Sequence, residues 1–282
     1  MNDTFRVKEN KANFVCRIAY CVCRRARLTE RHLKKQSQFP GISITCRELV
    51  ERALIGLCLL LCSAAGLNGR DKPAAENPAS RWEQTIREFE DWDSKNSFAS
   101  DAVLFVGSSS IRLWPTRECF GEFAVINRGF GGSQISDVNY YADRIVLRYE
   151  PEAVVFYAGD NDVAAGKSAR RVFDDYKAFV KLVHGQLPRT RIVFVAIKPS
   201  GKRWSLWPVM KDANAMIKEF SEDDGRLFYF DSATPLLGSD GKPDAKFFLK
   251  DNLHLNAAGY EVWTKALRPI INEALKPDRK KR

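Results

Sequence analysis

The sequence predicts an α/β domain in which helices cover both faces of a parallel sheet. Short runs rich in β-branched and aromatic residues alternate with longer stretches of helical periodicity, a pattern typical of strands joined by crossover helices. Hydrophobic residues make up 45% of the sequence, so a domain of roughly 200 residues is long enough to bury a single core. Five expected strands fit a flavodoxin-like three-layer α/β/α sandwich with a five-stranded parallel sheet.

Each expected strand is a short apolar run that ends at polar or turn-forming residues. Gly107 bounds the first run and Gly159 bounds the third, as is usual for strands that are buried in a parallel sheet. The strands are expected over residues 103–106, 123–126, 153–158, 191–197 and 227–230.

Helical periodicity marks the segments around these strands. An opening helix over residues 81–95 carries Trp82, Ile86 and Phe89 at helical spacing, which predicts that it packs against the sheet. Asn256 is a good N-cap for a closing helix. The other helices are expected over residues 137–149, 169–187 and 208–220, and the closing helix runs through Val262, Ala266 and Ile270.

A hydroxyl-rich segment, Gly107-Ser108-Ser109-Ser110, follows the first expected strand. It places Ser109 just past the carboxyl end of that strand, where open α/β sheets bind their ligands. Glycine and serine are also ordinary turn residues, so the segment alone is equally explained as a turn. A nucleophilic role for Ser109 therefore depends on what the other segments supply.

An acid–base pair stands near the end of the chain, where Asp251 and His254 lie three residues apart in the loop that enters the closing helix. A carboxylate there can accept the imidazole Nδ1 proton and leave Nε2 to accept from a serine hydroxyl. The alternative is that Asp251 caps a turn and His254 only packs. Of the other two histidines, His32 lies in a basic leader, and His184 lies near the end of an expected helix, where a cation favours the helix dipole.

Two middle segments can supply donors for a developing oxyanion. Residues 127–132 follow the second expected strand, and their glycines, Gly132 among them, let a backbone N–H turn toward an oxyanion. A dinucleotide-binding fingerprint is excluded because Gln134 stands where its third small residue belongs. Residues 159–162 follow the third strand and include Asn161, whose side-chain amide is a candidate donor, although turn composition explains this segment equally well.

Taken in order, the four segments resemble the motif blocks of the GDSL-type, or SGNH, hydrolases, which are named for a Ser, a Gly, an Asn and a His. The resemblance extends over residues 100–270. It implies the SGNH hydrolase fold, Ser109 as nucleophile, and Asp251 and His254 as acid and base. It further implies an oxyanion hole formed by the Ser109 N–H, the Gly132 N–H and the Asn161 amide, with no metal and no organic cofactor.

One position departs from the family pattern, because Ser108 replaces the aspartate of its Gly-Asp-Ser block. That aspartate is not the triad acid, so the implied mechanism is retained while the hydrogen bonding beside the nucleophile changes. Ser108 and Ser110 remain alternative nucleophiles. Ser109 is preferred because it stands two residues after Gly107, where the serine of the family stands.

The loop after the fourth expected strand, residues 198–208, lies at the same sheet edge as Ser109. It contains Trp204 and Trp207, which are candidates to line an acyl or alcohol pocket, since such pockets are commonly walled by aromatic rings. The alternative is that both rings cover the edge of the core.

Positive charge is concentrated at the two ends of the chain. Residues 1–52 hold 12 Lys and Arg against 5 Asp and Glu, and residues 276–282 hold 5 against 1. The net charge of +10 therefore belongs to the ends, and the rest of the chain is close to neutral. A pI of 9.3 is thus no argument for nucleic-acid binding by the folded domain.

The predicted organisation has five parts. An apolar segment over residues 53–66 is too short to span a bilayer but has the length of a signal-peptide core. It predicts cleavage near Ala65 and export to the periplasm or medium. It also predicts that the mature domain has no stable membrane span. The alternative is a cytoplasmic protein in which this run forms a buried or interfacial helix. The other parts are a basic Cys-containing extension (1–52), disordered or absent from the mature protein, a linker (67–79), the SGNH hydrolase domain (80–275) and a basic tail (276–282).

Six of the seven cysteines precede the predicted domain. Cys119 is the one cysteine within it, so the domain is expected to need no disulfide. Cys16, Cys21, Cys23 and His32 do not form a recognisable pair of CxxC motifs, so a metal site there is not favoured.

The residues and the resemblance together predict a serine ester hydrolase, an acyl or acetyl esterase similar to lysophospholipases, acting on a small-molecule, glycan or lipid ester. Three alternatives remain open. The same groups could transfer an acyl group to a carbohydrate or lipid acceptor. The domain could instead be a non-catalytic carbohydrate- or lipid-binding module. A phosphate-bearing ligand at residues 107–110 is the third, and it would leave Asp251 and His254 unexplained.

Overall fold

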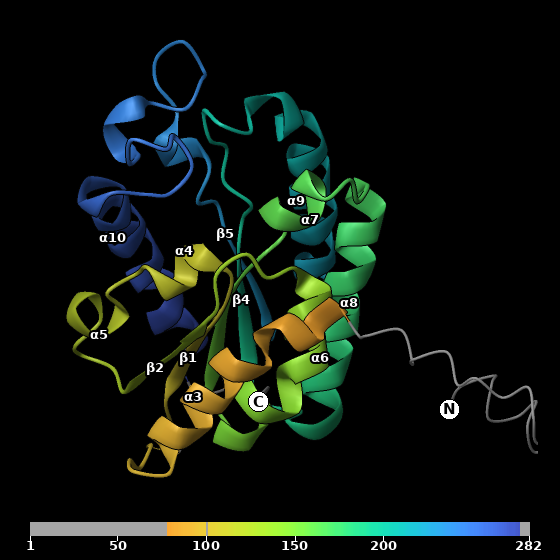
Figure 1. The fold of residues 1–282 in the computed structure, drawn as a ribbon, viewed down its shortest axis with the longest axis vertical. Coiled ribbons are helices and arrows are strands. Elements are labelled where there is room, and N and C mark those ends of the chain that lie inside the picture. Colours follow the sequence, from red (N-terminus) through yellow and green to blue (C-terminus); the bar gives the residue numbers. More distant parts are fainter. Residues whose placement is uncertain (1–77, 100, 277–282) are drawn as a thin grey trace, which may run out of the picture. The chain divides into compact units, whose positions relative to one another are not determined.

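The computed structural model describes residues 78–99 and 101–276, which belong to one compact unit, Ala75–Arg282. Within them, five parallel strands form one sheet in the order β2-β1-β3-β4-β5, the flavodoxin-like order, so the predicted fold class is confirmed (Figure 1). The strands are β1 (Val103–Gly107), β2 (Val125–Gly129), β3 (Ala153–Tyr157), β4 (Arg191–Val195) and β5 (Leu227–Phe230).

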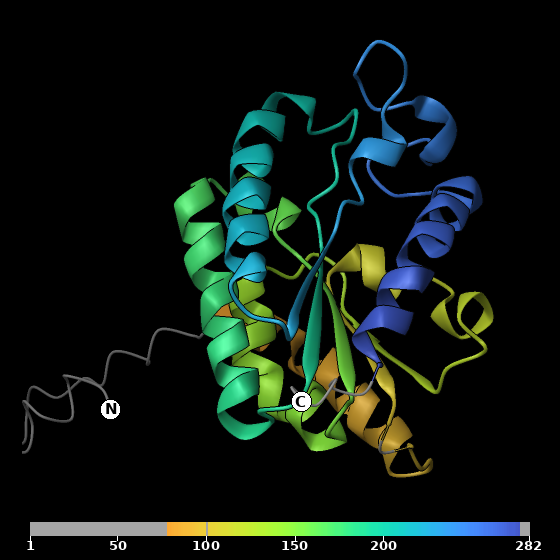
Figure 2. The same ribbon diagram turned by 180° about the vertical axis from the view of Figure 1, so that it is seen from behind.

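Helices lie on both sides of this sheet, as the two opposite views show (Figures 1 and 2). Three long helices pack on one face, and the closing helix packs on the other with two short helices. The first group is α6 (Ile135–Ile145), α8 (Ala169–Gln186) and α9 (Trp207–Glu222). On the same side, η1 (Pro78–Trp82) and α3 (Glu83–Asp93) pack against α6. The second group is α10 (Ala257–Ala274), α4 (Ser109–Arg112) and α5 (Thr116–Cys119).

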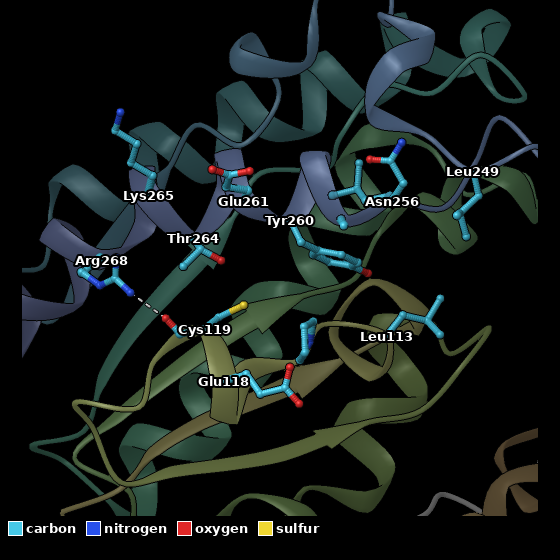
Figure 3. Close-up of a pocket in the computed structure, with 13 residues that line it drawn as sticks. Leu113, Glu118, Cys119, Leu249, Asn256, Tyr260, Glu261, Thr264, Lys265 and Arg268 are labelled. Atoms are coloured by element: carbon cyan, nitrogen blue, oxygen red, sulfur yellow. Dashed lines mark hydrogen bonds between the residues drawn. The ribbon is translucent and has the colours of Figure 1, made fainter.

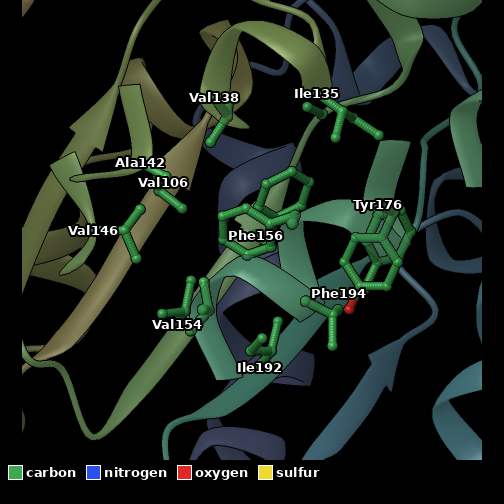
Figure 4. Close-up of a cluster of buried hydrophobic side chains, with 14 of the residues drawn as sticks. Val106, Ile135, Val138, Ala142, Val146, Val154, Phe156, Tyr176, Ile192 and Phe194 are labelled. Atoms are coloured by element: carbon green, nitrogen blue, oxygen red, sulfur yellow. The ribbon is translucent and has the colours of Figure 1, made fainter. Parts of the chain in front are cut away.

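The central strands divide their side chains between two hydrophobic clusters. In β3, Val154 and Phe156 point to the helices of the first group (Figure 4). Val155 and Tyr157 belong to the cluster of α10, because successive strand residues face opposite sides of a sheet. Every residue of β1 and β3 is buried. This double burial explains why these strands appear in the sequence as continuous apolar runs rather than alternating ones.

The strand register brings the carboxyl ends of β1, β2 and β3 to one level. Gly107 pairs with Gly129 on one side and with Tyr157 on the other. The segments that follow these strands therefore begin side by side at one edge of the sheet, which is the edge where open α/β sheets bind ligands.

Strand β2 is displaced from its expected position. The run over residues 123–126 predicts a strand two residues too early, because β2 continues through Asn127 and Arg128, whose polarity hides it. Asn127 donates to the carbonyl of Ile111 in α4 and accepts from Gly129 N–H in its own strand, so both ends of its amide are satisfied. Arg128 is buried for a different reason, a partner on α3.

Arg128 and Asp93 form a buried ion pair, with side-chain exposures of 7% and 1%. Arg128 Nε donates to Tyr149 Oη at 2.6 Å, and Tyr149 donates in turn to Asp93 at 2.5 Å. Burial, followed by the bond to Asp93, raises the pKa of Tyr149 to about 12, which keeps the phenol protonated as a donor. The ion pair between Arg128 and Asp93 therefore connects α3 to β2, an edge strand of the sheet.

Arg128→Met removes the buried partner of Asp93 and leaves that carboxylate with the half-exposed Arg148, 3.3 Å away, as its remaining cation, so it is expected to lower the free energy of unfolding by about 3 kcal/mol. Urea unfolding measures this loss. The matched control is Arg170→Met, whose exposed ion pair with Asp174 is screened by water, so its loss should change the free energy of unfolding very little. Equal losses in the two variants would contradict the assignment.

The predicted extension (1–52) and apolar segment (53–66), with the cysteines they contain, lie outside the described residues. Of the predicted linker (67–79), only Pro78 and Ala79 are described, at the start of η1. Within residues 78–99 and 101–276, no helix has the length and apolar character to cross a bilayer.

Candidate active site

Ser109 is the first residue of α4, directly after the end of β1. Gly107 makes this connection possible: it has a φ of +138°, and a Cβ there would lie 1.8 Å from the carbonyl oxygen of Tyr157. Ser108 N–H then donates to that same oxygen at 2.9 Å. The turn leaves Ser109 half-buried at the start of a helix, where backbone N–H groups have no partner within the helix.

The structure joins Ser109, His254 and Asp251 by hydrogen bonds. His254 Nε2 lies 3.0 Å from Ser109 Oγ, and His254 Nδ1 lies 2.6 Å from Asp251 Oδ2. In this arrangement Nδ1–H donates to the carboxylate, and the serine hydroxyl donates to Nε2. A hydroxyl, an imidazole and a carboxylate in series can transfer a proton away from the hydroxyl as it attacks.

The second oxygen of Asp251 determines how the carboxylate faces the imidazole. Oδ1 accepts the N–H groups of Leu253 and His254 at 2.9 and 3.0 Å. Desolvation alone would raise the pKa of Asp251, but these two N–H groups and the imidazole together hold that pKa well below its usual range. Asp251 is therefore ionised at neutral pH, although its side chain is 39% exposed.

The loop that carries Asp251 and His254 is closed by its own backbone. Asn252 has a φ of +52°, and Leu249 N–H donates to the His254 carbonyl at 2.8 Å. Asn256 caps α10, as predicted, by accepting Gly259 N–H at 3.1 Å. Tyr260 of α10 donates to the Ser110 carbonyl at 2.9 Å. This bond connects the helix after His254 to the helix that begins with Ser109.

Gly132 and Asn161 lie on the neighbouring segments of the same edge. Gly132 has a φ of +78°, a left-handed conformation that glycine adopts without strain. Asn161 is the second residue of α7 (Asp160–Ala164), which replaces the loop expected there. Its Nδ2 donates to the carbonyl of Ser133 at 3.0 Å, so the amide nitrogen lies beside the Gly132 segment.

Trp204 and Trp207 stack on each other, with ring centroids 6.4 Å apart. Trp207 packs against the hydrophobic cluster of α8 and α9 and lines a cavity of about 460 Å³ between α9 and the end of β5. That cavity contains none of Ser109, Asp251 and His254. A pocket-lining role for the two rings therefore stays a prediction.

A larger cavity of about 820 Å³ lies between α5 and α10 (Figure 3). Leu113, Leu249, Leu255 and Tyr260 form much of its wall. Leu255 follows His254 directly, but the cavity contains none of the three hydrogen-bonded groups. It borders the candidate site without including it.

Arg203 is a member of the site that the sequence did not reveal. It lies on the loop after β4 and donates to Asn161 Oδ1 at 3.0 Å and to Asp160 Oδ2 at 2.8 Å. The only signal in the sequence is its place at the carboxyl edge of a strand, which it shares with several other polar residues. Across the described residues, three or more His, Cys, Asp or Glu do not gather into a candidate metal site.

Comparison with known proteins adds independent evidence. The profile of the GDSL-like lipase/acylhydrolase family matches residues 112–262, more than half of the chain, a span that includes Gly132, Asn161, Asp251 and His254 but begins after Ser109. The chain is 27% identical over 220 residues to platelet-activating factor acetylhydrolase IB subunit alpha1 of Homo sapiens, covering 72% of this chain and 93% of that protein.

Solved structures share the fold. A GDSL-like lipase from Bacteroides thetaiotaomicron superimposes with a TM-score of 0.60 at 18% identity, over 67% of this chain and 98% of that one. A carbohydrate esterase family 3 protein from Talaromyces cellulolyticus superimposes with a TM-score of 0.50 at 16% identity, over 61% and 97%. From the family match, the chain belongs to the GDSL-like lipase/acylhydrolase family and is a hydrolase of ester bonds.

Proposed function

We propose that the protein is a serine esterase that removes acetyl or other short acyl groups from an alcohol, with Ser109 as nucleophile, His254 as general base and Asp251 as the carboxylate that orients His254. The observation that carries this proposal is the unbroken series of hydrogen bonds from Asp251 through His254 to Ser109 Oγ. The short acyl group is inferred from the acetylhydrolase to which the chain is similar.

The proposed reaction has two halves. Ser109 Oγ attacks the acyl carbonyl while its proton passes to His254 Nε2, and the tetrahedral oxyanion accepts from the N–H groups of Ser109 and Gly132 and from Asn161 Nδ2. The C–O bond to the alcohol breaks, and His254 returns the proton to the departing oxygen. Water then attacks the acyl-serine and gives a proton to His254. The C–O bond to Ser109 Oγ breaks, His254 returns the proton to Oγ, and the carboxylic acid leaves.

A fluorophosphonate probe tests the proposal, because it phosphonylates a serine only where a base and an oxyanion hole activate it. We expect one adduct on the full-length protein, located on Ser109 by peptide mass spectrometry, together with hydrolysis of p-nitrophenyl acetate. Absence of an adduct would support a non-catalytic binding module, and an adduct on Ser108 or Ser110 would reassign the nucleophile.

Product analysis separates hydrolysis from acyl transfer. With an acetylated sugar as substrate, we expect free acetate in the same yield whether or not a second sugar or glycerol is present as acceptor. Acetyl groups recovered on the acceptor instead of in solution would identify a transferase that uses the same residues.

Asn161→Ala is expected to keep the fold and lower kcat by about 10²–10³-fold, the usual loss for one oxyanion donor, because Nδ2 would interact with the oxyanion more strongly than with the ground-state carbonyl. Steady-state kinetics on p-nitrophenyl acetate measure this loss. Asn96→Ala, which removes only an exposed amide bonded to the Trp92 carbonyl, is the control and should retain wild-type kcat. A kcat within threefold of wild type in Asn161→Ala would exclude the proposed donor.

A further inference from the structure

Arg203 reaches from the loop after β4 to the start of α7. Its Nη2 donates to Asn161 Oδ1 at 3.0 Å, and its Nη1 donates to Asp160 Oδ2 at 2.8 Å. Only 18% of the side chain is exposed. One planar guanidinium therefore contacts two successive residues of α7, and one of them is the proposed oxyanion donor.

The amide of Asn161 can stabilise an oxyanion only if its nitrogen, and not its oxygen, faces the substrate. Its two neighbours determine which end points where. The guanidinium of Arg203 can only donate, and the carbonyl of Ser133 can only accept. If the amide were flipped, its NH₂ group would face the N–H groups of Arg203, and its oxygen would face the Ser133 carbonyl oxygen. Both contacts would then be repulsive.

Nδ2 carries two hydrogens, and the structure uses one of them. The first donates to the Ser133 carbonyl at 3.0 Å. The second remains available for the substrate, beside the segment of Gly132. Because Oδ1 accepts from a cation, electron density is drawn from the amide, which makes the remaining N–H a better donor.

Arg203 is held by the carboxylate of Asp160 and by the packing of its loop. A second, buried cation, Lys198, lies with its Nζ 3.9 Å from the same Asp160 oxygen, so the two cations share one carboxylate. The loop is also braced against the turn that contains Asn252, since Lys202 N–H donates to the Asn252 carbonyl at 3.0 Å. A Cβ at Gly201 would lie 3.3 Å from Asn252 Cβ, so the two loops pack closely.

We propose that Arg203 is a positioning residue that holds the Asn161 amide with Nδ2 toward the oxyanion. The proposal rests on the proposed function, in which Asn161 is an oxyanion donor. Arg203 acts through Asn161 and contacts no reacting atom, so its effect must disappear when Asn161 is absent.

A double-mutant cycle on the full-length protein tests this dependence with p-nitrophenyl acetate. Arg203→Met removes every donor of the guanidinium, while Lys198 remains beside Asp160. We expect Arg203→Met alone to lower kcat by about 10–100-fold, a part of what a lost oxyanion donor causes, with little change in KM. In the Asn161→Ala background the same substitution should change kcat by less than about threefold, because the two residues act as one unit.

Two further variants keep the test decisive. Arg203→Lys retains a cation beside Asp160 but lacks the planar guanidinium that donates to Asp160 and Asn161 at once. It too should lower kcat in the wild-type background and not in the Asn161→Ala background. It replaces Arg203→Met in the cycle if that variant does not fold. Arg226→Met is the matched control, because Arg226 bonds Asp224 and the Pro188 carbonyl in a similar way at the opposite edge of the sheet. It should leave kcat and KM unchanged.

Equal fold-losses from Arg203→Met in both backgrounds would overturn the proposal, and so would a loss confined to KM, which would indicate a direct contact with substrate. In either case Ser109→Ala would still be inactive, so the proposed function would stand while the role of Arg203 would be rejected. Failure of the proposed function would look different, because Ser109→Ala would then keep its activity and Asn161→Ala would be silent. The two failures are therefore distinguishable in one set of measurements.

Discussion

Ser109→Ala is expected to lower kcat for p-nitrophenyl acetate by about 10⁴–10⁶-fold. Without Oγ no acyl-serine forms, and the ester can react only with water held near the oxyanion donors. The loss should fall on kcat, because the missing interaction belongs to the transition state. Steady-state kinetics measure it, and the absence of a fluorophosphonate adduct confirms that the nucleophile is gone.

The neighbouring serines are the matched controls for this substitution. Ser108 and Ser110 are both buried, and Ser108 Oγ has no hydrogen-bond partner, so Ser108→Ala removes a hydroxyl that bonds nothing within the described residues. Ser108→Ala and Ser110→Ala are expected to retain kcat within about threefold, as substitutions that leave the reacting groups in place. A large loss in either control with activity retained in Ser109→Ala would move the nucleophile by one residue.

His254→Ala combined with Ser109→Ala should lose no more than Ser109→Ala alone. The imidazole removes the proton from Oγ, so it has nothing to act on once Oγ is absent, and residues that act as a unit are strongly non-additive. Kinetics of the double variant measure this. Independent, multiplying losses would show that His254 serves another role.

Asp251→Asn is expected to lower kcat by about 10³–10⁴-fold while leaving the loop in place. The N–H groups of Leu253 and His254 require an acceptor at Oδ1, so the new amide must turn its oxygen toward them and its NH₂ group toward Nδ1 of the imidazole. Nδ1 then has to accept, which places the ring proton on Nε2. An imidazole protonated at Nε2 cannot accept the proton of Ser109.

This reversal of the tautomer can be separated from a simple loss of charge. Asp251→Ala removes the carboxylate without forcing the tautomer, so it should retain more activity than Asp251→Asn at neutral pH, and steady-state kinetics on the two variants test the order. Asp240→Asn is the control, because the exposed Asp240 accepts Lys242 N–H in a similar turn far from an imidazole. It should keep wild-type kcat. A more active Asp251→Asn variant would contradict the assigned tautomer.

The arrangement of strands and most helices could be predicted because buried strands and amphipathic helices leave periodic patterns. Residues 227–230 match β5, and the helix expected over residues 169–187 is α8, which ends one residue earlier, at Gln186. The prediction failed at β2, where Asn127 and Arg128 are polar for reasons that lie outside the strand, a contact with α4 and an ion pair with α3. Local hydrophobicity contains no information about such partners.

The charge of His184 also depends on tertiary packing. This residue lies in the last turn of α8, as expected, and the bond from its Nε2 to the Thr190 carbonyl at 3.0 Å favours the charged form, but burial has the larger effect and lowers the pKa of the imidazole. Desolvation disfavours the charged form, and it is set by surrounding side chains that the sequence does not place.

A serine after one strand, an asparagine after another and an Asp–His pair before the closing helix could be placed from local patterns, while the roles proposed for them come from the resemblance to the GDSL-type hydrolases. These features are local, because each depends on a strand end or a helix start that leaves its own pattern. The folded chain was needed to show that Arg203 meets Asn161 and that Lys202 bonds Asn252. The two contacts join residues 42 and 50 positions apart in the sequence. Pairing of β4 with β3 brings the loop after β4 next to α7, and the same loop packs against the turn that contains Asn252. Orientation of the amide is therefore a property of the packed sheet and is absent from any single segment.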